Sequence, residues 1–113
     1  IQNTVKKMIS LGAQKKSIKS IIGPCIRVKS YDVSQEFVKK LKTQHQRFVV
    51  RQMQKIYFDL PKLAKFILSE SNILEVHDIK KNTFLDKNYF SFRESKKKKQ
   101  KDYGRNINLI SII

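Results

Sequence analysis

The side chains that could support metal or nucleophilic chemistry are few and widely spaced. The chain holds one cysteine, Cys25, and two histidines, His45 and His77. A catalytic zinc ion needs three protein ligands and an open position, whereas each of these residues stands alone in its segment, with no CxxC, HxH or HExxH pair. The spacing therefore argues against a metal site built from these three residues.

Cys25 follows Gly23 and Pro24 in the stretch IGPC. A nucleophilic thiol needs an adjacent base and a lowered pKa, and neither can be read from this stretch. Gly23 permits a close backbone approach and Pro24 fixes the direction of the chain. We interpret Cys25 as a small side chain packed beside a turn. His77, with acidic neighbours, and His45, in a polar connection, are interpreted as solvated rather than catalytic.

Hydrophobic periodicity predicts the elements that position these residues. Helical spacing predicts three helices, at 1–11, at 32–42 and from Asp59 to about Ser71. Gly12 offers a stop for the first helix, and Asp32 or Ser34 could cap the second. Short β-branched or alternating runs predict strands, and they lie at 18–22, 73–79, 89–93 and 105–113, with FVV at 48–50 ambiguous between a strand and an irregular connection.

This mixture of helices and strands predicts an α+β fold. The predicted strands carry apolar residues on both faces and need partner strands that the chain does not obviously contain. We therefore expect an incomplete mixed α/β sandwich. With 113 residues and 40% hydrophobic content, the chain has room for one domain, and we expect it to extend over residues 1–113.

The charge is strongly positive, with 25 Lys and Arg against 9 Asp and Glu, a net charge of +16. Such a charge favours nucleic acid as a partner, but the lysines are scattered, and a lysine-rich composition also arises by compositional drift. Nucleic-acid binding is therefore the alternative rather than the first hypothesis. We expect the block at 94–102 to form a basic flexible loop.

No apolar run is long enough to cross a bilayer, and a single cysteine gives no internal disulfide. We therefore expect a cytoplasmic protein with no membrane partner. The first residue is Ile1 rather than Met, and no signal-peptide pattern follows it. On this basis we expect the chain to be an excerpt of something longer.

Several short motifs together resemble a known family. In chain order they are TVKKMISLGA, IIGPCI followed by YDV, YFDLPKL, ILEVHDI, NTFLDKNYFSFR and YGRNINLISI. This set resembles the C-terminal half of the YfiH family, also called laccase-domain or polyphenol-oxidase-like proteins, across essentially the whole chain. The resemblance implies a YfiH-like fold of which the chain forms the C-terminal portion only.

The resemblance also implies an activity. Family members are described as zinc- or copper-dependent enzymes that phosphorolyse adenosine, inosine and methylthioadenosine, with an adenosine deaminase activity, although an older label is polyphenol oxidase. Their metal is held by two histidines and a cysteine that have no counterpart here. The implied substrates are a purine nucleoside and phosphate, and we expect no zinc or copper to be bound by this chain alone.

For the site, the resemblance points to Arg93, Ser91 and Cys25 as substrate-binding residues. A guanidinium suits phosphate, a carboxyl or a carbonyl, Ser91 could donate a hydrogen bond, and Cys25 corresponds to the cysteine of the family's GPC motif. The sequence departs from the family at Glu94, where a second arginine is usual, and at Asn82, where a cysteine often stands. Both departures weaken the expectation of retained activity.

Three hypotheses follow. In the first, the chain is an inactive fragment of a metal-dependent purine nucleoside phosphorylase, completed by a separately encoded N-terminal half. In the second, it is a small basic nucleic-acid-binding protein. In the third, it is a defunct fragment that does not fold stably, because its strand edges lack partners.

Overall fold

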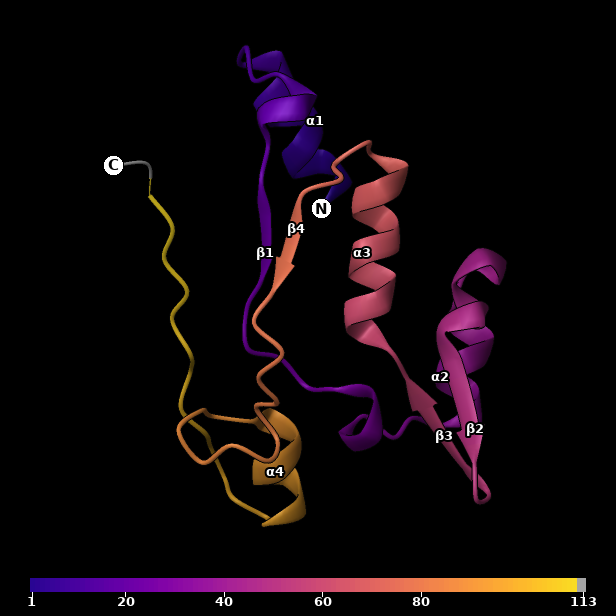
Figure 1. Cartoon of the computed structure of the whole chain (residues 1–113). Coiled ribbons are helices and arrows are strands. Elements are labelled where there is room, and N and C mark those ends of the chain that lie inside the picture. The colour runs from indigo at the N-terminus through magenta and orange to yellow at the C-terminus, as the bar shows by residue number, and fades with distance from the viewer. Residues whose placement is uncertain (112–113) are drawn as a thin grey trace.

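The computed structural model describes residues 1–111 and combines short helices with two separate two-stranded sheets (Figure 1). The α+β class predicted from the sequence is therefore confirmed. In chain order the elements are α1 (Gln2–Ser10), η1 (Lys15–Ser17), β1 (Ser20–Ile22), η2 (Val28–Ser30), α2 (Gln35–Lys40), η3 (Thr43–Phe48), β2 (Val49–Gln52), β3 (Lys55–Phe58), α3 (Leu60–Glu70), β4 (Val76–Asp78) and α4 (Phe92–Lys97), where η marks a 3-10 helix.

The helices begin and end at local sequence signals. The Ser34 side chain accepts a hydrogen bond from the Phe37 backbone N–H at 3.1 Å, and the Asp59 carboxylate accepts one from Lys62 at 3.1 Å. Each satisfies a donor that the first turn leaves unpaired. Gly12, at φ +99°, follows α1 in the left-handed region. The three predicted helices are confirmed, and Ser34 rather than Asp32 is the cap of α2.

Strands β1 and β4 form a parallel pair, with Ser20 opposite Val76 and Ile22 opposite Asp78. Both strands were predicted, and both are shorter than their apolar runs. Figure 1 shows them side by side, with α3 alongside β4. Cys25 lies beyond the end of β1, after Gly23 and Pro24, and a single parallel bridge to Asn82 continues the alignment past the strand ends.

The ambiguous FVV stretch belongs to a β-hairpin. Antiparallel β2 and β3 pair from Val49–Phe58 to Gln52–Lys55. The turn between them places Met53 at φ 46° and Gln54 at φ 61°. Two-residue turns of this kind match the right-handed strand twist but usually contain Asn or Gly. The sequence therefore lacked the usual hairpin signal, and strand β3 was not predicted.

Two predicted strands are wrong over the described residues. In the segment 89–93, Ser91 accepts a hydrogen bond from the Glu94 backbone N–H at 3.3 Å and starts helix α4, so the chain turns helical instead of extending. The first residues of the basic stretch 94–102 are thus helical. The tail, which we define as residues 104–111, runs without strand pairing in the described part of the chain. Residues 112 and 113 of the predicted last strand lie outside the described residues.

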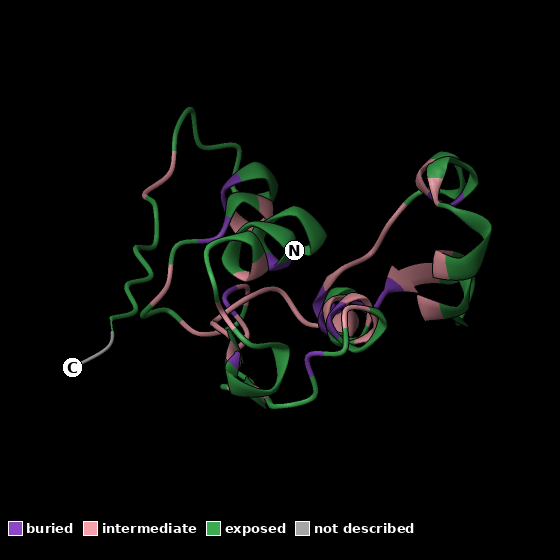
Figure 2. Ribbon diagram, turned by 90° about the horizontal axis from the view of Figure 1, so that it is seen from above, coloured by how far each residue is buried: buried purple, intermediate pink, exposed green. Residues whose placement is uncertain are grey.

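The core is small and divided. Val5, Ile18, Leu68 and Ile73 form one buried cluster, which joins α1, α3 and the segments that lead into β1 and β4. A second cluster is formed by the rings of Tyr31, Phe37 and Phe58, the last residue of β3. Figure 2 shows how little of the ribbon is buried, with exposed residues on every element. The apolar side chains therefore do not close around a single centre.

The overall dimensions agree with this open packing. The radius of gyration is 16.1 Å, whereas a self-contained domain of this length has about 13 Å. The accessible surface is 9104 Å², whereas a folded monomer of this mass exposes about 6,500 Å². The chain thus presents roughly 2,600 Å² more surface than a closed domain would. Within residues 1–111, the helices are all too short or too polar to span a membrane.

Candidate functional site

Cys25 is held in place by its backbone. Its N–H donates to the Lys81 carbonyl and its carbonyl accepts from the Thr83 N–H, both at 3.2 Å. Burial raises the pKa of the Cys25 thiol, and the positive charge of Arg27 opposes this effect only in part. A raised pKa keeps the thiol protonated, which makes it a poor nucleophile. The geometry therefore supports a packed side chain beside a turn.

Next to Cys25, Arg27 forms a bidentate ion pair with the nearly buried Asp78. Arg27 Nη1 lies 3.0 Å from Asp78 Oδ2, and Nη2 contacts Oδ1. Lys65 Nζ from α3 lies 3.0 Å from Oδ2, and the Lys80 N–H donates to Oδ1 at 2.9 Å. The Arg27 hydrogen bonds, assisted by these two donors, hold the pKa of the Asp78 carboxyl well below its usual range. This network joins β4, α3 and the chain that leads out of β1.

Asn82, one of the departures from the family motif, forms a hydrogen bond at each end of its side-chain amide. Its amide Nδ2 donates to Ser30 Oγ at 2.8 Å, and its Oδ1 accepts from the Phe84 N–H at 3.1 Å. A cysteine at this position would supply one weak donor and a weak acceptor. Asn82 therefore ties η2 to the loop after β4, a structural role that depends on an amide.

Arg93 lies on α4 and lines a hollow of about 490 Å³. Its Nη1 donates to the Asp32 backbone carbonyl at 2.8 Å and lies 3.6 Å from the Asp32 carboxylate. The guanidinium carbon lies 5.2 Å from the centroid of the Tyr31 ring, at cation–π distance. Because a guanidinium has five N–H donors, this anchored Arg93 keeps donors for a ligand. We call this space the Arg93 hollow, and it is lined by residues 31–34, Phe37 and Arg93.

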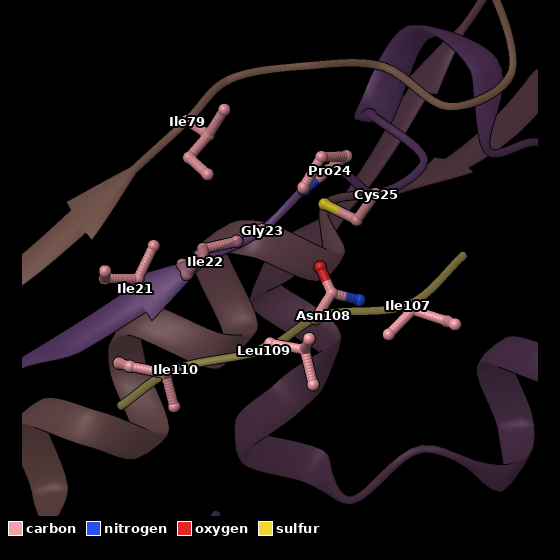
Figure 3. A pocket seen from close by; sticks show the side chains of 10 residues that line it. All are labelled: Ile21, Ile22, Gly23, Pro24, Cys25, Ile79, Ile107, Asn108, Leu109 and Ile110. Carbon is pink, nitrogen blue, oxygen red and sulfur yellow. The ribbon is translucent and has the colours of Figure 1, made fainter. Parts of the chain in front are cut away.

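The three residues predicted to bind substrate lie in three different hollows. Arg93 lines the one just described, and Ser91 lines a second, of about 520 Å³, beside Tyr89 and Tyr103. Cys25 lines a third, of about 560 Å³, between β1 and the tail (Figure 3). Ser91 is 8% exposed, and its oxygen is engaged as the cap of α4. The described residues therefore do not bring the three side chains to one centre.

The side chains present do not fit the zinc or copper ion of the family that the sequence resembles. In the part of the chain that the structure describes, no group of three or more His, Cys, Asp or Glu side chains could hold an ion. His77 is exposed on β4, and the ring of His45 packs edge-on against Phe66 at 6.4 Å. Asp78, the most buried carboxylate near Cys25, is already paired with Arg27.

The basic run 96–99 makes several contacts with its own chain. Lys96 Nζ lies 5.3 Å from the Phe92 ring centroid and Lys97 Nζ 4.7 Å from that of Phe84. Lys98 forms an i,i+4 ion pair with Glu94 at 2.6 Å. Glu94, the second departure from the family motif, is thus the partner of a lysine. Three of the four lysines thus contact side chains of this chain, and these contacts do not favour the nucleic-acid hypothesis.

The Arg27–Asp78–Lys65 network was missed by the sequence analysis. Arg27 and Asp78 are 51 positions apart, and no spacing rule connects residues at that distance. The one available signal was their position relative to the strands. Arg27 follows an apolar strand and Asp78 ends another, and the carboxyl ends of neighbouring parallel strands meet at one edge of a sheet.

Comparisons with known proteins give one family and two relatives. Residues 1–113 match the family described as multi-copper polyphenol oxidoreductase laccase. A purine nucleoside phosphorylase of Rickettsia prowazekii is 28% identical in an alignment over 112 residues that covers 95% of this chain and 46% of that protein. One from Rickettsia conorii is 26% identical over 112 residues, with the same coverage of both chains. The chain thus spans just under half the length of these curated relatives.

Proposed function

This chain belongs to the multi-copper polyphenol oxidoreductase laccase family, and we propose that it forms the C-terminal half of a purine nucleoside phosphorylase. The family is the one that the order of the sequence motifs predicted. The observation that carries the proposal is the match of all 113 residues to one family, combined with coverage of only 46% of two relatives named purine nucleoside phosphorylases. In this proposal the other half supplies the metal ligands and the proton-transfer groups.

The Arg93 hollow is the part of the substrate pocket that this half contributes. Phosphate needs fixed N–H donors, and the Arg93 guanidinium is held by the Asp32 carbonyl and the Tyr31 ring. Aromatic side chains beside such a donor suit a purine base or a ribose face, and Tyr31 and Phe37 line the same hollow. Ser91 and Cys25, the other two predicted substrate-binding residues, line separate hollows, and the proposal gives neither of them a contact with phosphate.

The proposal predicts that the isolated chain is inactive. With inosine, phosphate and added zinc or copper, we expect no ribose 1-phosphate. Turnover should appear when the chain is mixed with the segment of the Rickettsia prowazekii enzyme that does not align with it. Phosphorolysis can be followed by chromatography of hypoxanthine. Turnover by the isolated chain would contradict the proposed division of the site between two halves.

The role of Arg93 predicts a selective defect. In the assembled enzyme, Arg93→Lys should raise the KM for phosphate about tenfold to a hundredfold, since a bidentate charge-assisted contact contributes roughly 1.5–3 kcal/mol. The KM for inosine should change much less. Arg51→Lys is the matched control, because Arg51 is exposed on the hairpin and bonded only to Gln35 among the described residues. Equal phosphate KM values for the two variants would show that Arg93 does not bind phosphate.

A further inference from the structure

One edge of β1 has no partner in the described part of the chain. The Ser20 N–H donates to Glu75 at 2.9 Å and the Ile22 carbonyl accepts from Ile79 at 3.1 Å, so both residues face β4. Backbone groups alternate in direction along a strand. The N–H and C=O of Ile21 therefore point away from β4. An unpaired edge of this kind is a template for another strand.

The tail lies opposite this edge. Ile107 is 83%, Leu109 93% and Ile110 80% exposed, although a tail of this composition is suited to burial on both faces. At one end the tail comes close to β1, where Asn108 Oδ1 lies 3.0 Å from the position that a Cβ on Gly23 would take. Gly23 therefore permits this approach, while the remaining space between the tail and β1 stays open (Figure 3).

The resulting β1–tail hollow, bounded by residues 21–25, Ile79 and residues 107–110, is apolar and uncharged. Of its lining side chains, only those of Cys25 and Asn108 are polar, and none is ionised at neutral pH. A phosphate-bearing or strongly polar ligand would lose hydration here without a charged partner. An extended chain with apolar side chains would bury them between Ile21 and the tail and would pair its backbone with Ile21.

The surface area indicates a large macromolecular partner rather than a small ligand. The excess of roughly 2,600 Å² over a closed monomer is the size of one side of an extensive obligate interface. The chain covers 46% of its relatives, so a polypeptide of similar size completes the family's length. A net charge of +16 favours an acidic partner.

We infer that a β-strand of the polypeptide that completes the laccase fold inserts between β1 and the tail. The inserted strand pairs with the Ile21 edge on one side and with residues 107–110 on the other, and it joins the β1–β4 pair and the tail into one sheet. This inference rests on the proposed function, because it takes the second half of the same fold as the occupant. It adds the place and the manner of docking.

The test uses the full chain and, as the probe, the non-aligned segment of the Rickettsia prowazekii enzyme. Association is measured by titration calorimetry, and backbone protection by hydrogen exchange. We expect a one-to-one complex in which the amides of Ile21 and residues 107–110 become protected. Ile21→Pro, which removes the N–H that faces away from β4 and leaves the N–H groups of Ser20 and Ile22 in place, should weaken the affinity at least about tenfold, equivalent to 1.4 kcal/mol.

A second variant guards against misfolding. Leu109→Asp changes a side chain that is 93% exposed, so it should leave the free chain intact and still weaken association at least about tenfold. Leu74→Asp is the matched control, because Leu74 is 83% exposed but lies outside the β1–tail hollow. We expect this control to bind like the unmodified chain.

The outcomes separate the docking site from the function. If the complex forms and phosphorolyses inosine but both hollow variants bind normally, the docking site is wrong and the proposed function stands. If residues 21 and 107–110 become protected but no phosphorolysis follows, the docking site stands and the proposed function is wrong. Absence of any complex at about 100 µM, which means a Kd well above that concentration, overturns the docking inference.

Discussion

Replacing Asp78 by asparagine should lower the free energy of unfolding by about 3 kcal/mol. The Asp78 side chain is 7% exposed and neutralises Arg27, which is 18% exposed, together with the more accessible Lys65. Removing one partner of a buried ion pair leaves the other charge without compensation, which costs about 3–5 kcal/mol. Urea titration of the Asp78→Asn variant at neutral pH measures the difference.

The same pair predicts a dependence of stability on acid. The folded-state pKa of Asp78 is depressed by its Arg27 hydrogen bonds, so its contribution is complete above the unfolded value of about 3.9. It is lost as the pH falls below that value toward the depressed one. The stabilities of the unmodified chain and of Asp78→Asn should therefore converge in acid. A difference in unfolding free energy between the two proteins that stays constant down to the lowest pH would contradict the depressed pKa of Asp78.

Glu75→Gln is the matched control for this experiment. Glu75 precedes β4 and pairs with Lys19, but the two side chains are 61% and 73% exposed. Exposed pairs typically contribute no more than about 1 kcal/mol. A loss from Glu75→Gln equal to that from Asp78→Asn would show that burial of the Arg27–Asp78 pair is not the source of its effect.

Replacing Phe58 by alanine should cost about 4 kcal/mol, the range for a fully buried aromatic side chain. Phe58 is 2% exposed, and its ring lies 5.3 Å from that of Phe37 and 6.2 Å from that of Tyr31. Edge-to-face contacts of this kind add to the burial term. Because Tyr31 and Phe37 line the Arg93 hollow, the substitution should also loosen that hollow.

Two measurements check this prediction. Urea titration gives the stability, and near-ultraviolet circular dichroism reports the packing of the tyrosine rings. Leu74→Ala serves as the comparison, because Leu74 is 83% exposed and should cost little. If Phe58→Ala lost no more stability than Leu74→Ala, the aromatic cluster would not be a core.

Elements with local signals could be predicted from the sequence. Helix α3 has an aspartate cap, a proline in its first turn and an apolar face, and all three act within a few residues. Strand β1 ends at Gly23 and Pro24 for equally local reasons. Helix α4 also had a signal, because Ser91 and Glu94 stand at the spacing of a capping box, but the aromatic residues of YFSFR favoured an extended interpretation.

Elements that depend on distant partners could not be predicted. The hairpin turn at Met53 and Gln54 adopts positive φ without the usual residues, so only strand pairing reveals it. The tail has the composition of a central strand, yet strand formation requires a neighbour, and none pairs with it among residues 1–111. The contact of Arg27 with Asp78 likewise required the parallel arrangement of β1 and β4 to be known.

For the site, the motifs selected Arg93, Ser91 and Cys25 but could not give their separation. All three positions come from a pattern along the chain, whereas the distances between them depend on how α4 and the loop after β1 pack. The structure gives Arg93 the most favourable setting of the three, because Asp32 and Tyr31 already orient its guanidinium.

The parallel pairing of β1 with β4 also sets an order of assembly. Joining Arg27 to Asp78 closes a segment of 51 residues, which costs about 3.5 kcal/mol of chain entropy. The β2–β3 hairpin closes through two residues and forms within microseconds. We therefore expect both edges of β1 to remain unpaired until late in folding. At that stage β1 can pair with β4 on one edge and with the inserted strand of the partner polypeptide on the other. Pulsed hydrogen exchange during refolding would reveal β1 and β4 as the last amides protected.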